Sequence, residues 1–229
     1  TYAFFSTYPI NRIRIPFGSF VVNLTIPEDE LYNNMKSNCK KSIRTAINKG
    51  LIVKVGGKEL LNDYMSIDLQ TWKRSNMDIN NEKLYENILS SLPNNSIIIN
   101  SYKDNVPQGG AIFIFDNNIC YYLYGARRND SANGSSNILH WEAMKYMKSK
   151  GVKLYSFVGA RINEDENSKY HYIQAFKASF GSDLKNCFLF KVIFNKFMYR
   201  LYNLALSIKS KNKYIDIIDQ ELYKWKSIN

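Results

Sequence analysis

Three consecutive apolar runs joined by short polar links constrain the fold of this chain more than any other feature. The runs are Ser96–Tyr102, Gln108–Phe115 and Ile119–Ala126, and the links are Lys103–Asn105 and Asp116–Asn118. Links of this length, rich in Asn and Asp, are typical of tight turns. The three runs therefore predict three antiparallel strands that are neighbours both in sequence and in the sheet.

The segment after the third run predicts a parallel crossover. A polar loop at Arg127–Ser136 precedes a helical pattern at Asn137–Lys150, Gly151 ends that helix, and an apolar run follows at Lys153–Val158. A strand, a helix and a second strand in this order form a βαβ unit, whose two strands are parallel. We therefore expect an α/β (α+β) fold with a mixed central sheet flanked by helices.

The rest of the chain supplies further helices and two more strands. A strand is predicted at Ser19–Leu24, and Thr25 with Glu28 fits a capping box that starts an interrupted helix ending at Gly50. The remaining predictions are a strand at Leu51–Val55 and helices at Lys58–Ser75, Glu82–Leu92, from Phe194 onward, and at Lys211–Asn229. We divide the chain into a remnant or linker (1–17), one α/β domain (18–192) and a C-terminal helical segment (193–229).

Composition limits the classes of function. The chain has 229 residues, 45% of them hydrophobic, with 31 Lys and Arg against 20 Asp and Glu, a formal net charge of +11. Such a chain buries a large core and favours anionic partners, among which nucleic acid, nucleotide-linked sugars, acyl-CoA and anionic lipid stay open. Its three cysteines are far apart and lack metal-ligand spacing. It shows neither a membrane-spanning run nor a signal peptide, and it begins with Thr1, as a fragment would.

Two basic segments are candidates for binding anions. The loop Arg127–Ser136 lies between a strand and the next helix, where free backbone N–H groups and the helix dipole favour phosphate. An ordinary surface loop is the alternative. In the helix ending at Gly50, Ile43 and Ala46 mark an apolar stripe and leave Lys41 and Arg44 on other faces. Those two side chains either are simply solvated or form an anion-binding face.

Several of these segments, in this order, resemble the FemABX family, whose members have the acyltransferase fold of the GCN5-related (GNAT) superfamily. The similarity extends from about Ser19 to Tyr202, and the combination of segments is more specific than any one of them. The matching segments are Lys40–Ala46 with Gly50, Tyr121–Ala126, Leu139–Met144, Tyr155–Gly159, Phe176–Lys177 and Phe180–Gly181. The resemblance implies a GNAT-like fold and aminoacyl transfer from aminoacyl-tRNA to peptidoglycan precursors.

The resemblance also assigns catalytic candidates. The family's Phe-Lys pair matches Phe176 and Lys177, and its lysine is thought to stabilise the negative charge that develops when an amine attacks the donor ester. A fixed cation aimed at a developing oxyanion lowers the barrier by a few kcal/mol. Tyr124, at the end of the strand before the loop, is expected to hydrogen-bond acceptor or donor. A lysine that merely follows a core phenylalanine and a buried core tyrosine are the structural alternatives.

The substrate-binding candidates are basic residues. Arg127 and Arg128 would bind the phosphate of a nucleotide-sugar acceptor, because a planar guanidinium matches phosphate oxygens. Lys41 and Arg44 are candidates for the same work. Arg161 follows the strand at Lys153–Val158, where the carboxyl end of a strand meets a ligand crevice.

The chain departs from the family pattern in two ways. Full-length relatives carry two acyltransferase-like halves, and here seventeen residues precede the recognisable second half, which puts the peptidoglycan substrate in doubt. Ser156 stands where many members have an aspartate. Other chemistry is poorly supported: His140 and His171 fit packed or surface positions, and the acidic cluster Glu164–Glu166 fits a solvated loop better than a metal site.

We therefore expect an amino-group acyltransferase acting on a cell-wall or surface-glycan precursor by direct attack of an amine on an activated donor. The co-substrate is aminoacyl-tRNA or acyl-CoA, with no bound cofactor or metal, and the acceptor is a nucleotide- or lipid-linked glycan precursor. The protein is expected in the cytoplasm, and at the inner membrane face if the basic amphipathic helix after Phe194 contacts lipid rather than packing on the core. The alternative is a catalytically silent domain that binds an anionic glycan precursor, nucleic acid or membrane surface.

Overall fold

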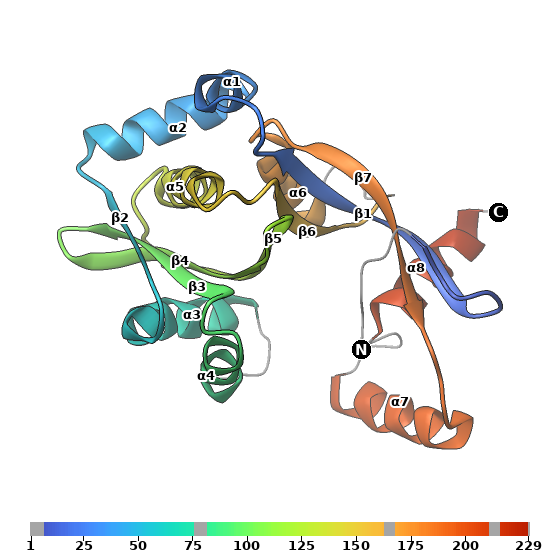
Figure 1. The fold of residues 1–229 in the computed structure, drawn as a ribbon. Coiled ribbons are helices and arrows are strands. Elements are labelled where there is room, and N and C mark those ends of the chain that lie inside the picture. The colour runs from blue at the N-terminus through green and yellow to red at the C-terminus, as the bar shows by residue number, and fades with distance from the viewer. Residues whose placement is uncertain (1–6, 76–81, 163–167, 211–215, 229) are drawn as a thin grey trace. The chain divides into compact units, whose positions relative to one another are not determined.

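A computed structural model describes residues 7–75, 82–162, 168–210 and 216–228. Seven strands form one mixed sheet in the order β2-β3-β4-β5-β6-β1-β7. The strands are β1 (Ile13–Asn23), β2 (Ile52–Gly56), β3 (Ser96–Lys103), β4 (Val106–Phe115), β5 (Ile119–Arg127), β6 (Leu154–Ala160) and β7 (Asp183–Lys191). The helices are α1 (Glu28–Asn33), α2 (Ser37–Asn48), α3 (Leu61–Ser75, after a 3₁₀ turn at Lys58–Leu60), α4 (Glu82–Ser91), α5 (Ser135–Ser149), α6 (Lys169–Ala178), α7 (Lys196–Ser210) and α8 (Ile217–Ile228) (Figure 1).

The chain divides into two compact units. The larger unit comprises residues 20–158 and 166–184, and the smaller unit comprises residues 1–19, 159–165 and 185–229. The strands β1, β6 and β7 each contribute residues to both units. The predicted boundary between residues 17 and 18 falls inside β1, which begins at Ile13.

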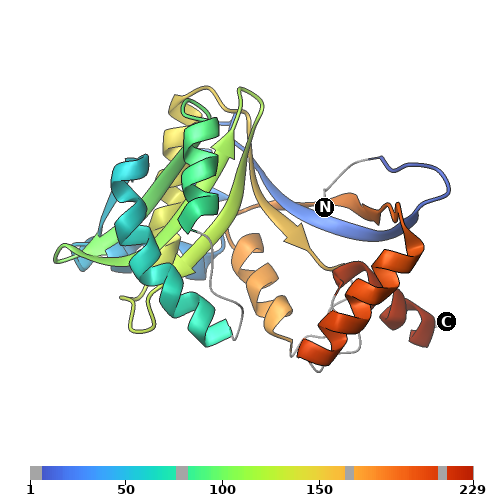
Figure 2. The ribbon, with the colours of Figure 1, turned by 90° about the horizontal axis from the view of Figure 1, so that it is seen from below.

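The larger unit contains the predicted meander and crossover. Strands β2, β3, β4 and β5 pair antiparallel in that order, and β5 pairs parallel with β6. Helices α2 and α5 cover one face of these strands and α3 and α4 cover the other (Figures 1 and 2). A cluster of buried apolar side chains that includes Tyr64, Tyr85 and Ile98 packs α3 and α4 against β3 and β4. The predicted mixed sheet flanked by helices is confirmed.

The strands β5 and β6 stay paired over only part of their length. Their register runs from Ile119 opposite Leu154 to Tyr121 opposite Ser156. No further pair between them occurs among the described residues, although β5 continues to Arg127 and β6 to Ala160. The carboxyl ends of two parallel strands are therefore left unpaired with each other, and this is the place where an open α/β sheet accepts a ligand.

A β-bulge in β5 decides which face its tyrosines occupy. Ile112 pairs with Tyr124 but the next residue, Phe113, pairs with Tyr122, so that Leu123 is the extra residue on β5. One inserted residue reverses the alternation of side chains. Tyr122 accordingly faces α5, and Tyr124 faces α3 and α4, where it packs against Tyr85 with ring centroids 5.1 Å apart.

Two sequence predictions need correction. The predicted capping box is wrong, because α1 begins at Glu28 after Pro27 without a side-chain cap, and the Thr25 hydroxyl instead donates to Asn23 Oδ1 at 2.8 Å. The strand β7 was not predicted. Its first four residues are exposed, so the run lacks the apolar alternation by which a strand is recognised.

The smaller unit has its own core and its own buried charges. Ile15, Phe17, Leu189 and Ile218 form an apolar cluster. The buried ammonium of Lys191 is surrounded by Asp216, Asp219 and Tyr199, as paired buried charges require. The helix α7 leaves many of its apolar side chains exposed, among them Phe197, Met198, Leu201, Tyr202, Leu204 and Ile208.

Candidate active site

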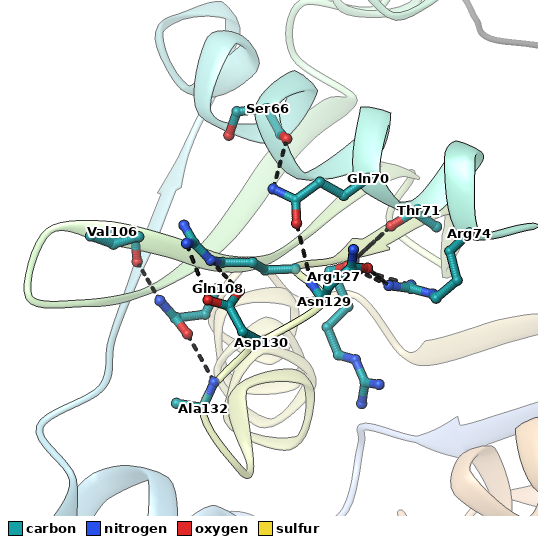
Figure 3. Close-up of polar contacts among 11 residues, drawn as sticks. Ser66, Gln70, Thr71, Arg74, Val106, Gln108, Arg127, Asn129, Asp130 and Ala132 are labelled. Atoms are coloured by element: carbon teal, nitrogen blue, oxygen red, sulfur yellow. Dashed lines mark hydrogen bonds and ion pairs between the residues drawn. The ribbon is translucent and has the colours of Figure 1, made fainter.

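The loop after β5 is held on both sides by side-chain hydrogen bonds (Figure 3). On the α3 side, Thr71 Oγ1 accepts from Arg127 N at 3.1 Å, and Gln70 Oε1 accepts from Asn129 N at 3.2 Å. On the β4 side, Gln108 bridges the Val106 carbonyl and the Ala132 amide at 3.1 and 2.8 Å. The loop predicted as an anion cradle is thus fixed by groups on two elements, which preorganises the backbone for a ligand.

The loop leads directly into the N-terminus of α5. Gly134 precedes the helix with a positive φ of 85°, and a Cβ at this position would collide with the Ser42 carbonyl oxygen of α2. Glycine meets both requirements, because it lacks a Cβ and tolerates positive φ. No hydrogen-bond acceptor is found among the described residues for the amides of Ser136 and Asn137, and the first turn carries no acidic residue. These amides can bind an anion.

Two adjoining cavities open beside this helix terminus. The outer cavity, about 610 Å³, is lined by Arg74, Arg127, Asn129, Ser131, Ala132, Asn133, Gly134, Ser135, Ser136, Asn137, Ile173 and Phe176. The inner cavity, about 130 Å³, is lined by Thr71, Arg74, Gly110, Tyr122, Gly125, Ala126, Arg127, Ser136, Leu139, His140 and Phe176. They share Arg74, Arg127, Ser136 and Phe176, so a ligand in the outer cavity can extend into the inner one.

The two predicted arginines face different spaces. Arg127 lines both cavities, and its guanidinium has no partner among the described residues. Arg128 lines a third cavity of about 480 Å³ near Lys49 and Lys103, and its guanidinium is paired with Asp130 at 2.5 Å. This pairing lowers the pKa of Asp130 and raises that of Arg128. Of the pair, Arg127 alone offers an uncompensated guanidinium to the outer cavity.

Lys177 follows the cavity-lining Phe176 in α6 and is 8% exposed. Its Nζ donates to the Val158 carbonyl at 2.8 Å, and burial lowers the pKa of Lys177 to about 8. Val158 has a φ of 45°, which is a genuine outlier for a β-branched residue, and its amide donates to Ser156 Oγ at 3.1 Å. Strained backbone of this kind costs roughly 1–3 kcal/mol and gathers at functional sites.

An aromatic cluster surrounds His140, and its members Tyr122, His140 and Phe176 line the inner cavity. His140 lies at the centre of the cluster, with ring centroids 4.6 Å from Tyr122, 5.0 Å from Phe157, 5.7 Å from Phe176 and 5.5 Å from Phe180. Burial and, to a lesser degree, the positive charge of Lys177 lower the pKa of His140 to about 3, so the imidazole is neutral. The charge of Lys177 is therefore felt by a residue that lines the cavity.

The other predicted residues are not among those that line these two cavities. Tyr124 packs in the core on the opposite face of the sheet. Lys41 and Arg44 are exposed on α2, and neither is among the residues that line the two cavities. Arg161 lies in the smaller unit, where its buried guanidinium donates to Glu221 Oε1 at 2.6 Å. The substrate-binding roles of Lys41, Arg44 and Arg161 stay predictions.

Sequence reasoning missed three residues of the site: Thr71, Arg74 and Tyr122. Thr71 and Arg74 are part of α3, more than fifty residues before the loop that they contact, and nothing in their own segment marks them. The sequence favours Tyr124 over Tyr122 as the hydrogen-bonding tyrosine, because Tyr124 lies nearer the end of the strand. The phenol of Tyr122 lies over Gly125, where a Cβ would collide with it.

Among the described residues, no three His, Cys, Asp or Glu side chains converge as metal ligands, and no helix is long and apolar enough to cross a membrane. The acidic cluster Glu164–Glu166 lies outside the described residues.

The sequence itself matches a known family over most of its length. The sequence model of the FemAB family aligns with residues 11–99 and 92–207. The chain belongs to the FemAB family. The expected relationship to the FemABX proteins is confirmed.

Curated relatives of this FemAB protein are staphylococcal. A protein named lipid II:glycine glycyltransferase from Staphylococcus epidermidis is 29% identical over 163 residues, covering 70% of this chain and 38% of the relative. The protein of the same name from Staphylococcus haemolyticus is 34% identical over 94 residues, covering 40% of this chain and 22% of the relative. The chain spans less than two fifths of the length of these relatives.

Solved structures show the same fold at low sequence identity. FemX superposes with a TM-score of 0.70 at 17% identity, covering 80% of this chain and 63% of the FemX chain. The C-terminal domain of a putative lysylphosphatidylglycerol synthetase from Agrobacterium fabrum gives a TM-score of 0.58 at 15% identity, covering 90% and 69%. The expected acyltransferase-type fold is thereby confirmed.

Proposed function

We propose that this FemAB protein is an aminoacyltransferase that moves an aminoacyl group from aminoacyl-tRNA to an amine of a lipid-linked cell-wall precursor. The family membership and the names of the staphylococcal relatives support this reaction class. The observation that carries the proposal is the pair of adjoining cavities. A cationic outer cavity at a helix N-terminus opens into a small inner cavity with an aromatic wall beside Lys177.

The reaction needs no covalent enzyme intermediate. The acceptor amine attacks the carbonyl carbon of the ester, a C–N bond forms, and the carbonyl electron pair moves onto oxygen. Collapse of this tetrahedral intermediate expels the ribose oxygen of the tRNA, and the proton of the attacking nitrogen reaches that oxygen directly or through water. The protein supplies orientation and charge stabilisation, which suit a site with fixed donors.

Arg127 is the residue best placed to hold the phosphate of the donor. Its guanidinium has no partner among the described residues, and Arg127 lines the outer cavity together with Ser136 and Asn137, whose amides have no acceptor in the same part of the chain. Together, the guanidinium and the helix N-terminus favour binding of a phosphate group of the ligand over binding of a carboxylate side chain of the protein. An acyl-CoA also carries phosphates, so the comparison of donors is part of the test.

Lys177 acts through its charge. With a pKa of about 8 it is mostly protonated at neutral pH, and its charge acts on His140, which lines the inner cavity. A charge in a region of low dielectric acts on a nearby developing oxyanion more strongly than it would in water. Phe176, the neighbour of Lys177, packs against the donor and thereby positions it.

We propose further that α7 places the protein on the inner face of an anionic membrane, where a lipid-linked acceptor is found. Exposed Phe197, Leu201 and Ile208 share this helix with Lys196 and Arg200. An apolar helix face with basic neighbours inserts into the interface of an anionic bilayer. Co-sedimentation with vesicles containing phosphatidylglycerol tests this step, and loss of binding is expected for a Phe197→Ser, Leu201→Ser variant.

The test of the reaction uses the purified protein with three donors: charged tRNA, uncharged tRNA and acetyl-CoA. Transfer to a lipid-linked precursor is expected with charged tRNA alone. Arg127→Ala should raise the donor KM at least tenfold, while Arg128→Ala, whose guanidinium is already paired with Asp130, should change it less than threefold. Equal effects of the two substitutions would contradict the assignment of the phosphate to the outer cavity.

Binding without transfer would support the alternative, a catalytically silent domain. Lys177→Ala then becomes decisive, because a binding module has no use for a buried lysine near the cavity. Unchanged transfer by Lys177→Ala would remove Lys177 from the catalytic assignment, and transfer lowered by about 10²-fold or more with unchanged donor KM would support it.

A further inference from the structure

His140 combines a nearly complete burial with an unused ring nitrogen. The side chain is 2% exposed, and its Nδ1 lies 2.6 Å from the Tyr155 hydroxyl. Among the described residues, no hydrogen-bond partner is found for Nε2. In that part of the chain, the fully buried side-chain atoms without a hydrogen-bond partner are Tyr64 Oη and Asn100 Oδ1. Nε2 also has no partner but is not one of these atoms, so it is not fully buried. His140 is among the residues that line the inner cavity, which therefore borders its ring.

The partner of Nδ1 fixes the tautomer of the ring. The Tyr155 hydroxyl is fully buried, and within the described residues His140 is its one hydrogen-bond partner. If Nδ1 carried the proton, the buried Tyr155 O–H would have no acceptor, which costs about 1–3 kcal/mol. The favoured arrangement has the Tyr155 hydroxyl donating to Nδ1, and this places the ring proton on Nε2.

We propose that His140 is a catalytic hydrogen-bond donor whose Nε2–H binds the carbonyl oxygen of the transferred aminoacyl group in the inner cavity. This inference rests on the proposed acyl transfer and adds a residue to it. The carbonyl oxygen gains negative charge when the amine attacks, and the Nε2–H bond strengthens as that charge develops. The proton stays on Nε2 throughout, so no acid or base step is assigned to the ring.

The neutral state of the ring suits it to this role. Its pKa of about 3 keeps it neutral at any working pH, because burial and the nearby Lys177 charge oppose a second proton. A neutral ring can donate from Nε2 without competing for the proton of the amine. Tyr155 is a positioning residue, since it acts through His140 and does not line either cavity.

The variants are compared in a Tyr155→Phe background, which avoids leaving a buried hydroxyl without a partner. His140→Gln keeps an N–H donor near the position of Nε2, and His140→Met has similar length without a donor. Both lose the aromatic ring equally. In single-turnover transfer from glycyl-tRNA, His140→Gln should keep the rate within about tenfold of the background, and His140→Met should lose about 10²-fold with an unchanged donor KM. Equal losses in the two variants would overturn the proposal.

A second measurement is independent of turnover. Nitrogen-15 NMR of protein labelled at histidine reports which ring nitrogen carries the proton, and His171→Gln assigns the second of the two histidines. A proton on Nε2, with a shift of that resonance on addition of 3′-glycylamido-3′-deoxyadenosine, supports the proposal. A proton on Nδ1, or no shift with a saturating ligand, overturns it.

The two measurements separate the inference from the function on which it rests. If the wild-type protein transferred no aminoacyl group from any charged tRNA, the proposed function would fail. The NMR result would then still decide whether Nε2–H meets the carbonyl of the ligand. If transfer occurred and His140→Met kept the rate of the background, the function would stand and the role of His140 would be refuted.

Discussion

The wild type and Lys177→Met should differ in opposite ways as the pH rises. Relative to the variant, the free energy of unfolding of the wild type should increase, and its rate of transfer should decrease. The burial of Lys177 lowers its pKa from 10.5 to about 8 in the folded protein. Between these two values the unfolded chain binds the proton more tightly than the folded one. The wild-type protein therefore gains stability as the pH rises through 8, and a methionine at this position removes that gain.

The magnitude follows from the same shift. From pH 7 to pH 9 the folded lysine goes from about nine tenths to about one tenth protonated, while the unfolded lysine stays protonated. Integrating the difference gives a gain of about 1 kcal/mol for the wild type relative to Lys177→Met. Over the same range the catalytic advantage that depends on the ammonium charge should fall about tenfold, because the charged fraction falls about tenfold.

The assay pairs urea unfolding with single-turnover transfer for both proteins at pH 7, 8 and 9. The comparison cancels the titration of the acceptor amine, which is common to both. Lys83→Met, an exposed lysine of α4, is the control and should show neither effect. If the ratio of wild-type to Lys177→Met rates stayed constant or rose with pH, the charge of Lys177 would not be the source of its contribution. If the stability difference did not change with pH, Lys177 would not be buried as described.

Other predictions follow from single positions. Gly134→Ala should destabilise the protein by roughly 2–4 kcal/mol, because the new side chain meets both a positive φ and a collision with α2. Gly50→Ala should cost about 1 kcal/mol, because Gly50 has a positive φ of 71° but open space around it. Thermal unfolding of the two variants compares these costs. Tyr122→Phe should slow transfer more than Tyr124→Phe, because the bulge places only Tyr122 at the inner cavity, and the reverse order in a steady-state assay would refute that argument.

The order of β3, β4, β5 and β6 could be derived from the sequence. Tight polar links force neighbouring strands to pair antiparallel, and the loop, helix and strand after Arg127 force a parallel crossover, so local signals sufficed. Phe176 was predicted from the resemblance and Arg127 from the position of its loop, and both residues line the two cavities. Their roles stay predictions.

The sequence could not separate residues that look alike. Arg127 and Arg128 are adjacent and chemically identical, yet Asp130 neutralises only the second, and their side chains line different cavities. Arg161 follows a strand as a ligand-binding arginine would, but Glu221, sixty residues later, binds it. These distinctions depend on contacts between distant segments, which no local pattern records.

The sequence by itself determined the mixed sheet and the family, because these depend on periodicity and on turn residues that act locally. The tertiary structure alone decided which side chains line the cavities. The extra residue Leu123 places Tyr122 rather than Tyr124 at the inner cavity, and α3 supplies Thr71 and Arg74. His140, which the sequence placed in a packed or surface position, lines the inner cavity, and its Nε2 has no hydrogen-bond partner among the described residues. The physical reason is that burial and hydrogen-bond partners set the state of a side chain, and both come from residues far away in the sequence.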